Sequence, residues 1–376
     1  MPSSPQWRTE PTGLLREARD IRRLSLEQWG DRKVTTVIGQ HASIRIALER
    51  VARIAPADGP TILTGETGTG KELFARALYL LSARRGKPFI SVNCAQYHDS
   101  QLIASELFGH RRGSFTGAVG DHRGVFEAAA GGVVFLDEVG ELTLGAQSML
   151  LRVLSESEII PVGDTAARAV DVRVIAATSR DLPSMVVAGA FRSDLYYRLR
   201  HMHIHVPAVR ERGDDWELIA ADQLQRLVAT TGRRKQLADD AVALMSDYPW
   251  PGNVRELKSV VDTGFHMADG DMIDASVFAQ ELESVSRTAQ LQRVPMADGR
   301  RDPLLRMFED EESFWDVVHR PYLNRELSRA EVKAILEQGL QRSRGSYRRL
   351  LALFRIDSAD YLKFMDFLRH QRLKPE

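Results

Sequence analysis

The chain has 376 residues, of which 43% are hydrophobic and 27% charged, a balance typical of soluble globular proteins that excludes a disordered chain. Its 51 basic and 51 acidic residues cancel, so any surface for nucleic acid must come from local segregation of charge. The one cysteine, Cys94, excludes an internal disulfide and favours a reducing compartment. No segment suits a signal peptide or a membrane span, so we expect two or three cytoplasmic domains without a membrane partner.

The N-terminal half predicts one short helix followed by an α/β domain. Residues 1–33 form the expected helical extension, because four of their residues recur at helical spacing: Leu14, Ala18, Ile21 and Ser25. Residues 34–210 alternate helical patterns with short apolar runs, which lie at 61–65, 88–93, 133–138 and 172–178. This alternation predicts a parallel sheet covered by helices.

The rest of the chain predicts only helices and a linker. Residues 211–283 lose the strand runs and form a small helical subdomain with a turn at 249–253. Residues 284–312 are polar and lack periodicity, which indicates a linker. Residues 313–376 are helical again and carry 13 basic against 8 acidic residues, a net charge of +5. This last segment is therefore the candidate for DNA contact.

The stretch GETGTGKE, at 65–72, follows an apolar run and opens a helix. Its glycines let backbone N–H groups turn onto phosphate oxygens, and Lys71 supplies a positive charge near the helix N-terminus. The stretch therefore predicts a phosphate loop, whose nucleotide-binding residues are Gly65, Glu66, Thr67, Gly68, Thr69, Gly70, Lys71 and Glu72. Glu72 departs from the general pattern, which has Ser or Thr there to contact magnesium.

Further polar groups are expected at the carboxyl edge of the sheet. The third apolar run ends in Asp137 and Glu138, where one carboxylate can hold Mg²⁺ and the other can activate water. The fourth run ends in Thr178, placed either to sense a γ-phosphate or simply to begin a turn. Arg192 and Arg198 can neutralise charge on a transferring phosphate, although surface salt bridges are the ordinary role of arginine.

Taken together, the motifs between about residues 34 and 283 resemble the central domain of the sigma-54-dependent transcriptional activators, or bacterial enhancer-binding proteins, of the AAA+ ATPase superfamily. The matching motifs, in the family's order, are GETGTGKE, NCA at 93–95, SELFGH at 105–110, GSFTGA at 113–118, FLDE, GAFRSDLYYRL and PWPGNVREL. AAA+ proteins in general share the phosphate loop and the acidic pair, whereas the Gly-Phe-Thr-Gly loop belongs to this family.

The resemblance implies a role for each residue at the sheet edge. Lys71 and the loop glycines would bind ATP, Asp137 would coordinate Mg²⁺, and Glu138 would be the catalytic base. Asn93 would pair with Glu138 as a switch that links nucleotide state to loop position. Glu72 is typical of the family, so this departure casts little doubt on ATP binding.

The resemblance also implies a ring. Arg192 and Arg198 resemble the arginine fingers that act across a subunit boundary in a homo-oligomer, which we expect to be hexameric. Arg255 resembles the sensor arginine of the helical lid, the subdomain at 211–283.

The GSFTGA loop raises the question of what its phenylalanine touches, because Phe115 lies on no helical stripe or strand face. By resemblance, the loop contacts the sigma-54 RNA polymerase holoenzyme through Gly113, Ser114, Phe115, Thr116, Gly117 and Ala118. The alternative is that Phe115 folds back onto its own domain. The chain departs from the family pattern at Ser114, where Ala is usual, at Ser179, where Asn is usual, and at 206–212; none of these is a catalytic group.

Family members usually end in a Fis-like helix-turn-helix that binds enhancer DNA. Residues 313–376 have the right length, but the would-be recognition helix near 358–370 carries Asp360 and Asp366 and is rich in apolar residues. We therefore expect a degenerate helix-turn-helix that grips promoter-upstream DNA through arginines. A helical interaction module with Trp315 and Tyr322 in its core is the alternative.

The sequence thus predicts an ATPase that activates sigma-54-dependent transcription. Two other functions remain open: a nucleotide-binding regulatory adaptor, and an AAA+ ATPase that acts on a different client. No attached sensor domain is evident, so we expect control by a separate regulatory partner or by abundance.

Overall fold

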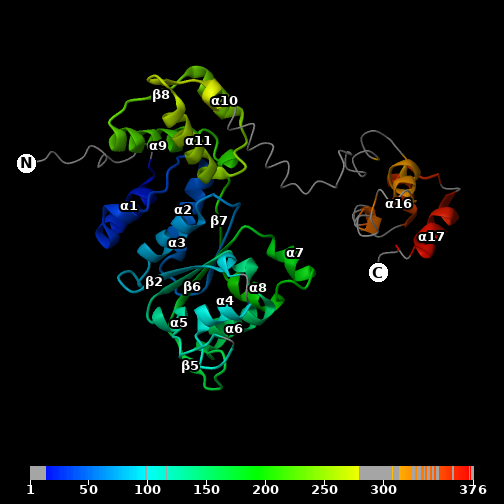
Figure 1. Ribbon diagram of the computed structural model, residues 1–376, viewed down its shortest axis with the longest axis horizontal. Coiled ribbons are helices and arrows are strands. Elements are labelled where there is room, and N and C mark those ends of the chain that lie inside the picture. The colour runs from blue at the N-terminus through cyan, green and yellow to red at the C-terminus, as the bar shows by residue number, and fades with distance from the viewer. Residues whose placement is uncertain are drawn as a thin grey trace, which may run out of the picture. The chain divides into compact units, whose positions relative to one another are not determined.

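The computed structural model describes residues 14–97, 100–115 and 117–278, and shorter pieces of the C-terminal part: 307, 313–323, 327, 332–333, 335–336, 339–340, 343, 347–357, 360–371 and 373. The chain divides into two compact units, Met1–Glu283 and Ser284–Glu376 (Figure 1). Within these described ranges, no helix is both long and apolar enough to cross a membrane.

A five-stranded sheet organises the first unit, with strand order β2-β3-β6-β1-β7 and every pair parallel. The strands are β1 (Thr61–Thr64), β2 (Phe89–Asn93), β3 (Val133–Asp137), β6 (Arg173–Thr178) and β7 (Met202–His205). The register places Asn93 beside Asp137 and Thr64 beside Thr178, so the carboxyl ends of four strands are level. Parallel strands bring their carboxyl ends to one edge, and this edge carries the polar residues predicted there.

Helices cover both faces of the sheet, because successive strand residues point to opposite sides. In β3, Val133 and Phe135 join a core shared with α1, α2, α3 and the lid helices. Val134 and Leu136 join a second core shared with α4 to α8. The first set comprises α1 (Arg16–Trp29), α2 (Ala42–Ile54) and α3 (Lys71–Leu80); the second comprises α4 (Ser100–Phe108), α5 (Val125–Ala128), α6 (Leu144–Glu156), α7 (Leu182–Val187) and α8 (Ser193–Leu199).

The N-terminal helix α1 docks on the first face. Its helically spaced residues Ala18, Ile21 and Ser25 are fully buried, and Trp29 stacks on Tyr79 of α3 with ring centroids 5.6 Å apart. Ser25 Oγ accepts a hydrogen bond from the Thr35 backbone N–H at 3.0 Å, which ties the helix to the segment that follows it. Helix α1 is thus packed onto the α/β subdomain.

The helical lid follows the sheet. It comprises α9 (Asp215–Thr231), α10 (Asp239–Asp247) and α11 (Asn253–Met267), with a short parallel pair of strands, β8 (Gln236–Leu237) and β9 (Met272–Ile273). Trp250 in the predicted turn is 1% exposed and its indole N–H donates to the Met245 carbonyl, which anchors the turn before α11. The prediction of an α/β domain with a parallel sheet and a helical lid is confirmed.

The second unit, in its described pieces, is helical: η6 (Trp315–His319), α14 (Arg320–Leu323), α16 (Tyr347–Leu353) and α17 (Tyr361–His370). Phenylalanines meet in its core, where the Phe314 ring stacks on Phe354 at 5.4 Å and meets Phe364 edge to face at 5.2 Å. Trp315 and Tyr322 pack partly buried against this core. Gly345, where the sequence could form the turn of a helix-turn-helix, lies outside the described residues.

Candidate functional site

The glycine-rich loop joins β1 to α3 and adopts a conformation that side chains would not tolerate. Gly65, Gly68 and Gly70 all have positive φ, at 151°, 81° and 98°. A Cβ on Gly68 would lie 2.2 Å from the carbonyl oxygen of Gly252 in the lid, so the close approach of two backbones requires glycine there. Gly70 immediately precedes α3, so the loop leads directly into a helix N-terminus. This is the geometry of a phosphate-binding loop.

Lys71 lies across the loop. Its side chain is 6% exposed, and Nζ donates to the carbonyl oxygens of Gly65 at 3.0 Å and Glu66 at 3.2 Å. The same nitrogen is 3.6 Å from Glu138 Oε1, so the lysine links the loop after β1 to the acid after β3. The structure therefore brings together the lysine and the acidic pair, which are far apart in the sequence.

The two acids occupy different environments. Burial, together with the negative charge of Glu138, raises the pKa of Asp137 above its usual value. Glu138 has a left-handed backbone, with φ 51° and ψ 52°, which is unusual for a residue other than glycine. This conformation turns its carboxylate away from the strand direction, towards Lys71 and the end of β6.

Ser179 holds the Glu138 carboxylate. Its backbone N–H donates to Oε2 at 2.9 Å, and its hydroxyl lies 3.1 Å from Oε1 and 3.0 Å from Oε2. Asn93, the partner expected for Glu138, lies beside Asp137 in the sheet, and its Oδ1 accepts from the Ala95 N–H at 3.0 Å. In the described chain, the side-chain contacts of Glu138 are thus with Ser179 and Lys71. The sequence had marked Ser179 as a departure from the family pattern without revealing this contact.

Lys71, Asp137 and Glu138 form what we call the Lys71 cluster. Some of the remaining predicted groups lie beside this cluster, and the others have their contacts elsewhere. Thr178 is fully buried beside the acids, and Arg255 lies in the first turn of α11, with its Cβ close to Gly68. Arg192 pairs with Asp194 at 2.8 Å, and Arg198 donates to the Leu154 carbonyl on α6. Both arginines thus bind partners outside the Lys71 cluster.

The segment that carries GSFTGA forms a separate feature on the α4 to α8 side. The Phe115 ring is half-buried and meets the His110 ring edge to face at 4.9 Å. His110 in turn stacks on His122 at 5.5 Å, and its Nδ1 lies 2.6 Å from Ser105 Oγ. The aromatic contact of Phe115 is therefore a histidine that the sequence analysis did not single out. Thr116 lies outside the described residues.

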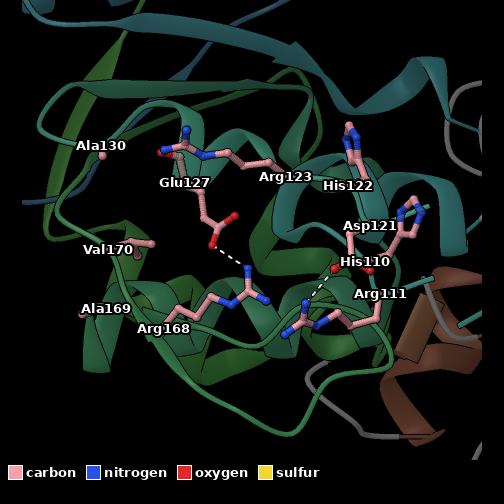
Figure 2. Close-up of a pocket in the computed structure, with 10 residues that line it drawn as sticks. All are labelled: His110, Arg111, Asp121, His122, Arg123, Glu127, Ala130, Arg168, Ala169 and Val170. Carbon is pink, nitrogen blue, oxygen red and sulfur yellow. Dashed lines mark hydrogen bonds and ion pairs between the residues drawn. The ribbon is translucent and has the colours of Figure 1, made fainter.

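A cavity of about 530 Å³ opens beside this histidine pair (Figure 2). Two ion pairs shape its wall, Arg111 with Asp121 at 2.6 Å and Arg168 with Glu127 at 2.8 Å. Arg168 belongs to β5 (Arg168–Ala169), which pairs with β4 (Glu158–Ile159). Arg111 also reaches Asp164 between these strands at 2.9 Å, so this hairpin supports the GSFTGA segment.

Comparisons with known proteins agree with this geometry. Residues 37–205 match the sigma-54 interaction domain, and residues 210–294 match the AAA+ ATPase lid domain. The hydrogenase transcriptional regulatory protein HoxA of Cupriavidus necator is 47% identical over 62% of this chain and 48% of its own length. The Nif-specific regulatory protein of Azotobacter vinelandii is 41% identical over 71% of this chain and 51% of its own. The chain thus spans about half the length of the curated relatives it matches.

Among solved structures, NtrX from Brucella abortus in complex with ADP superposes with a TM-score of 0.61 at 25% identity, over 89% of this chain and 69% of that one. The fold and the two matched domains define a protein of the AAA+ class. More specifically, residues 37–205 match the sigma-54 interaction domain that the motifs predicted, and an AAA+ lid domain follows it.

Proposed function

We propose that the protein is a sigma-54-dependent transcriptional activator, in which a homo-oligomeric ring uses ATP hydrolysis to remodel the closed complex of sigma-54 RNA polymerase. The observation that carries the proposal is the meeting of Lys71, Asp137 and Glu138 at the sheet edge of a chain that displays GSFTGA on a separate segment. The names of the relatives, which are transcriptional regulators, support it.

In this proposal the 65–72 loop binds ATP; the structures of NtrX from Brucella abortus in complex with ADP and with ATP support nucleotide binding. Lys71 Nζ would exchange the carbonyl oxygens of Gly65 and Glu66 for phosphate oxygens, which are stronger acceptors because they are charged. Thr178 and Arg255 would complete the nucleotide site from β6 and the lid. The buried Lys71 thus has a resting position on its own loop.

In this proposal Asp137 and Glu138 would have different roles in ATP hydrolysis. The raised pKa of Asp137 reflects burial and the neighbouring negative charge, both of which a divalent cation offsets, so Asp137 fits the role of Mg²⁺ ligand. When bound, Mg²⁺ would neutralise phosphate charge. Glu138 would take the proton of the attacking water at a carboxylate oxygen, after that oxygen gives up its contact with Ser179 or Lys71. Asn93 would report nucleotide state to this group.

Arg192 and Arg198 would act on the nucleotide of a neighbouring subunit, since their contacts within the chain lie outside the Lys71 cluster. Two large apolar side chains near them are exposed, Val187 at 91% and Tyr197 at 71%. Exposed apolar side chains beside functional arginines suit a subunit interface. We propose a hexameric ring on this basis and on the family resemblance.

For the rest of the chain, we propose the division expected from the sequence: 1–33 extension, 34–210 α/β subdomain, 211–283 lid, 284–312 linker, and 313–376 a degenerate helix-turn-helix that contacts promoter-upstream DNA. The net charge of +5 on the last segment supports DNA contact. A partner of RNA polymerase works in the cytoplasm, and a separate regulatory partner would control it.

The test is open-complex formation on a sigma-54 promoter with purified sigma-54 polymerase and ATP. Wild type should melt the promoter, whereas Phe115→Ala should hydrolyse ATP at the wild-type rate and leave the promoter closed, because the polymerase contact is lost while Lys71, Asp137 and Glu138 are unchanged. Val119→Ala is the matched control, since this neighbouring apolar side chain is 85% exposed. Hydrolysis without melting by wild type would indicate a different client, and nucleotide binding without hydrolysis would indicate an adaptor.

A further inference from the structure

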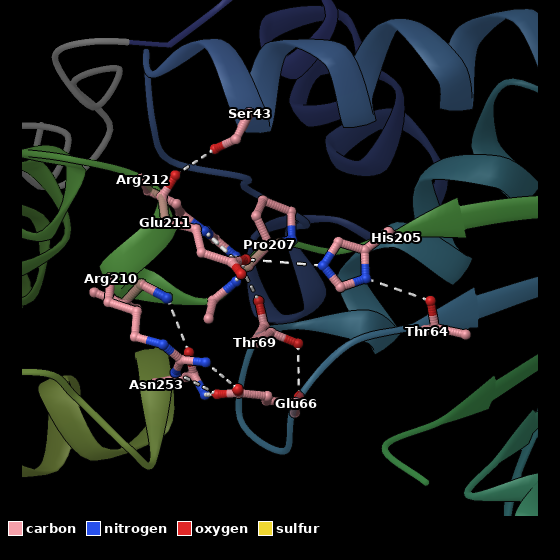
Figure 3. Close-up of polar contacts among 12 residues, drawn as sticks. Ser43, Thr64, Glu66, Thr69, His205, Pro207, Arg210, Glu211, Arg212 and Asn253 are labelled. Atoms are coloured by element: carbon pink, nitrogen blue, oxygen red, sulfur yellow. Dashed lines mark hydrogen bonds and ion pairs between the residues drawn. The ribbon is translucent and has the colours of Figure 1, made fainter. Parts of the chain in front are cut away.

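One residue of the lid reaches into the phosphate loop. Asn253 is fully buried at the start of α11 and has a left-handed backbone with φ 54°. Its Nδ2 donates to Glu66 Oε2 at 3.0 Å and to the Thr67 carbonyl at 3.1 Å, and its Oδ1 accepts from the Val209 N–H at 2.9 Å. A single carboxamide therefore joins three segments: the loop, the lid, and η5 (Val209–Glu211) between them (Figure 3).

The carboxylate of Glu66 receives a second partner from the same direction. Arg210 of η5 forms a two-point ion pair with it, with NH1 at 2.7 Å from Oε2 and NH2 on Oε1. These contacts lower the pKa of Glu66 to about 2, chiefly through the hydrogen bond from Arg210 and, secondarily, through that from Asn253. Glu66 thus points out of the loop towards the lid, as Figure 3 shows.

The backbone of the loop is held on the same side. Arg212, 3% exposed, donates to the Thr69 carbonyl at 3.0 Å as well as to the Pro207 carbonyl at 2.7 Å. Gly68 approaches the Gly252 carbonyl so closely that a Cβ would lie 2.2 Å from it. Residues 66–69 of the loop are therefore held from the lid side, in addition to the contacts that Lys71 makes with the Gly65 and Glu66 carbonyls.

We propose that Asn253 is a positioning residue for nucleotide binding: its carboxamide, with Arg210 on the shared Glu66 carboxylate, holds the phosphate loop in its binding conformation and couples that conformation to the lid. This inference rests on the proposed ATPase function for its affinity readout only. A preformed loop spends no binding energy on ordering, so Asn253 sets nucleotide affinity rather than the rate of the chemical step.

The left-handed backbone supplies a variant that isolates the side chain. Asn253→Gly keeps a residue that adopts φ 54° freely and removes only the carboxamide. Ser157→Gly is the matched control, because Ser157 has φ 56° and ends α6, outside the site. Glu66→Gln removes the charge at the other end of the contact, and the double variant tests whether the two act as a unit.

Two readouts separate the inference from the function it rests on. In nucleotide-free protein, amide hydrogen exchange of residues 66–69 should be faster in Asn253→Gly than in Ser157→Gly or wild type. Binding of ATP and ADP should weaken by roughly 5- to 30-fold in Asn253→Gly, with kcat within about twofold of wild type at saturation. Asn253→Gly and Glu66→Gln should be non-additive in the double variant.

Unchanged exchange of the loop, or unchanged affinity, would overturn the inference, as would a large fall in kcat at saturating ATP. Failure of wild type to bind ATP would instead contradict the proposed function, and the exchange experiment would still test whether Asn253 holds the loop. If Asn253→Gly does not fold, Asn253→Asp serves, because it keeps the acceptor for Val209 and places an oxygen against Glu66; wild-type affinity in that variant would equally refute the inference.

Discussion

The contact between Ser179 and Glu138 leads to a prediction about basal turnover. In this structure both oxygens of the catalytic-base candidate accept from Ser179, and one also lies 3.6 Å from Lys71. A carboxylate whose lone pairs are engaged in this way is a weaker acceptor for the proton of water. We therefore expect Ser179→Ala to raise the basal ATPase rate.

The size of the effect follows from the bonds lost. Alanine removes the hydroxyl, which touches both oxygens at 3.0 and 3.1 Å, and keeps the backbone N–H at 2.9 Å. A hydrogen bond to a charged group contributes about 1.5–3 kcal/mol, and the exposed position of Ser179 favours the lower value. About 1.4 kcal/mol corresponds to a tenfold change, so kcat should rise by up to about tenfold.

Steady-state ATPase kinetics provide the assay. KM for ATP should stay within about twofold of wild type, because Ser179 is not expected to bind nucleotide directly. Ser155→Ala, at an exposed serine of α6, is the control. A fall in kcat would refute the reasoning, since it would mean that Ser179 holds Glu138 in its working position; an unchanged kcat would mean that the contact carries no energetic weight.

Two further predictions concern the ionisation of the Glu66 carboxyl group and the Cys94 thiol. The pKa of Glu66 is lowered from 4.5 to about 2, so its folded-state contacts contribute stability that is fully present above about pH 4.5 and is lost as the pH falls towards 2. The difference in Tm between wild type and Glu66→Gln should therefore be constant from pH 7 to about 5 and shrink below that, and a difference that grows on acidification would contradict it. Burial, helped by the charges of Asp137 and Glu138, raises the pKa of the Cys94 thiol to about 12, and the side chain is 2% exposed. Mass spectrometry should accordingly find Cys94 unmodified by iodoacetamide at pH 8 in native protein and modified in urea; rapid native labelling would show that the sheet edge opens.

The phosphate loop could be predicted from the sequence because its conformation and charge depend on residues that are neighbours in the chain. Glycines that need positive φ, a lysine at a helix start and acids at the end of an apolar run all lie within a few positions of one another. The parallel sheet was likewise predictable, since burial on both faces demands continuous apolar runs. The order β2-β3-β6-β1-β7 was not, because strand order depends on how crossovers pack.

The contacts between segments that are distant in the chain could not be predicted from the sequence. Nothing near Ser179 indicates that its hydroxyl meets Glu138, nor does anything near Phe115 single out His110 among several polar neighbours. The predicted pairing of Asn93 with Glu138 came from resemblance, and the structure gives each of these side chains a different contact.

What the sequence by itself determined, then, is the identity of the candidate groups at the sheet edge, the α/β fold with its lid, and the resemblance of residues 37–205 to the sigma-54 interaction domain. What only the tertiary structure decided is which partner holds each group at rest: Lys71 on its own loop, Glu138 on Ser179, and Glu66 on Asn253 and Arg210. The physical reason is that identity follows from local backbone and charge requirements, which a few residues encode. Hydrogen-bond partners at 3 Å depend instead on the register of strands and the seating of the lid, which the whole core sets.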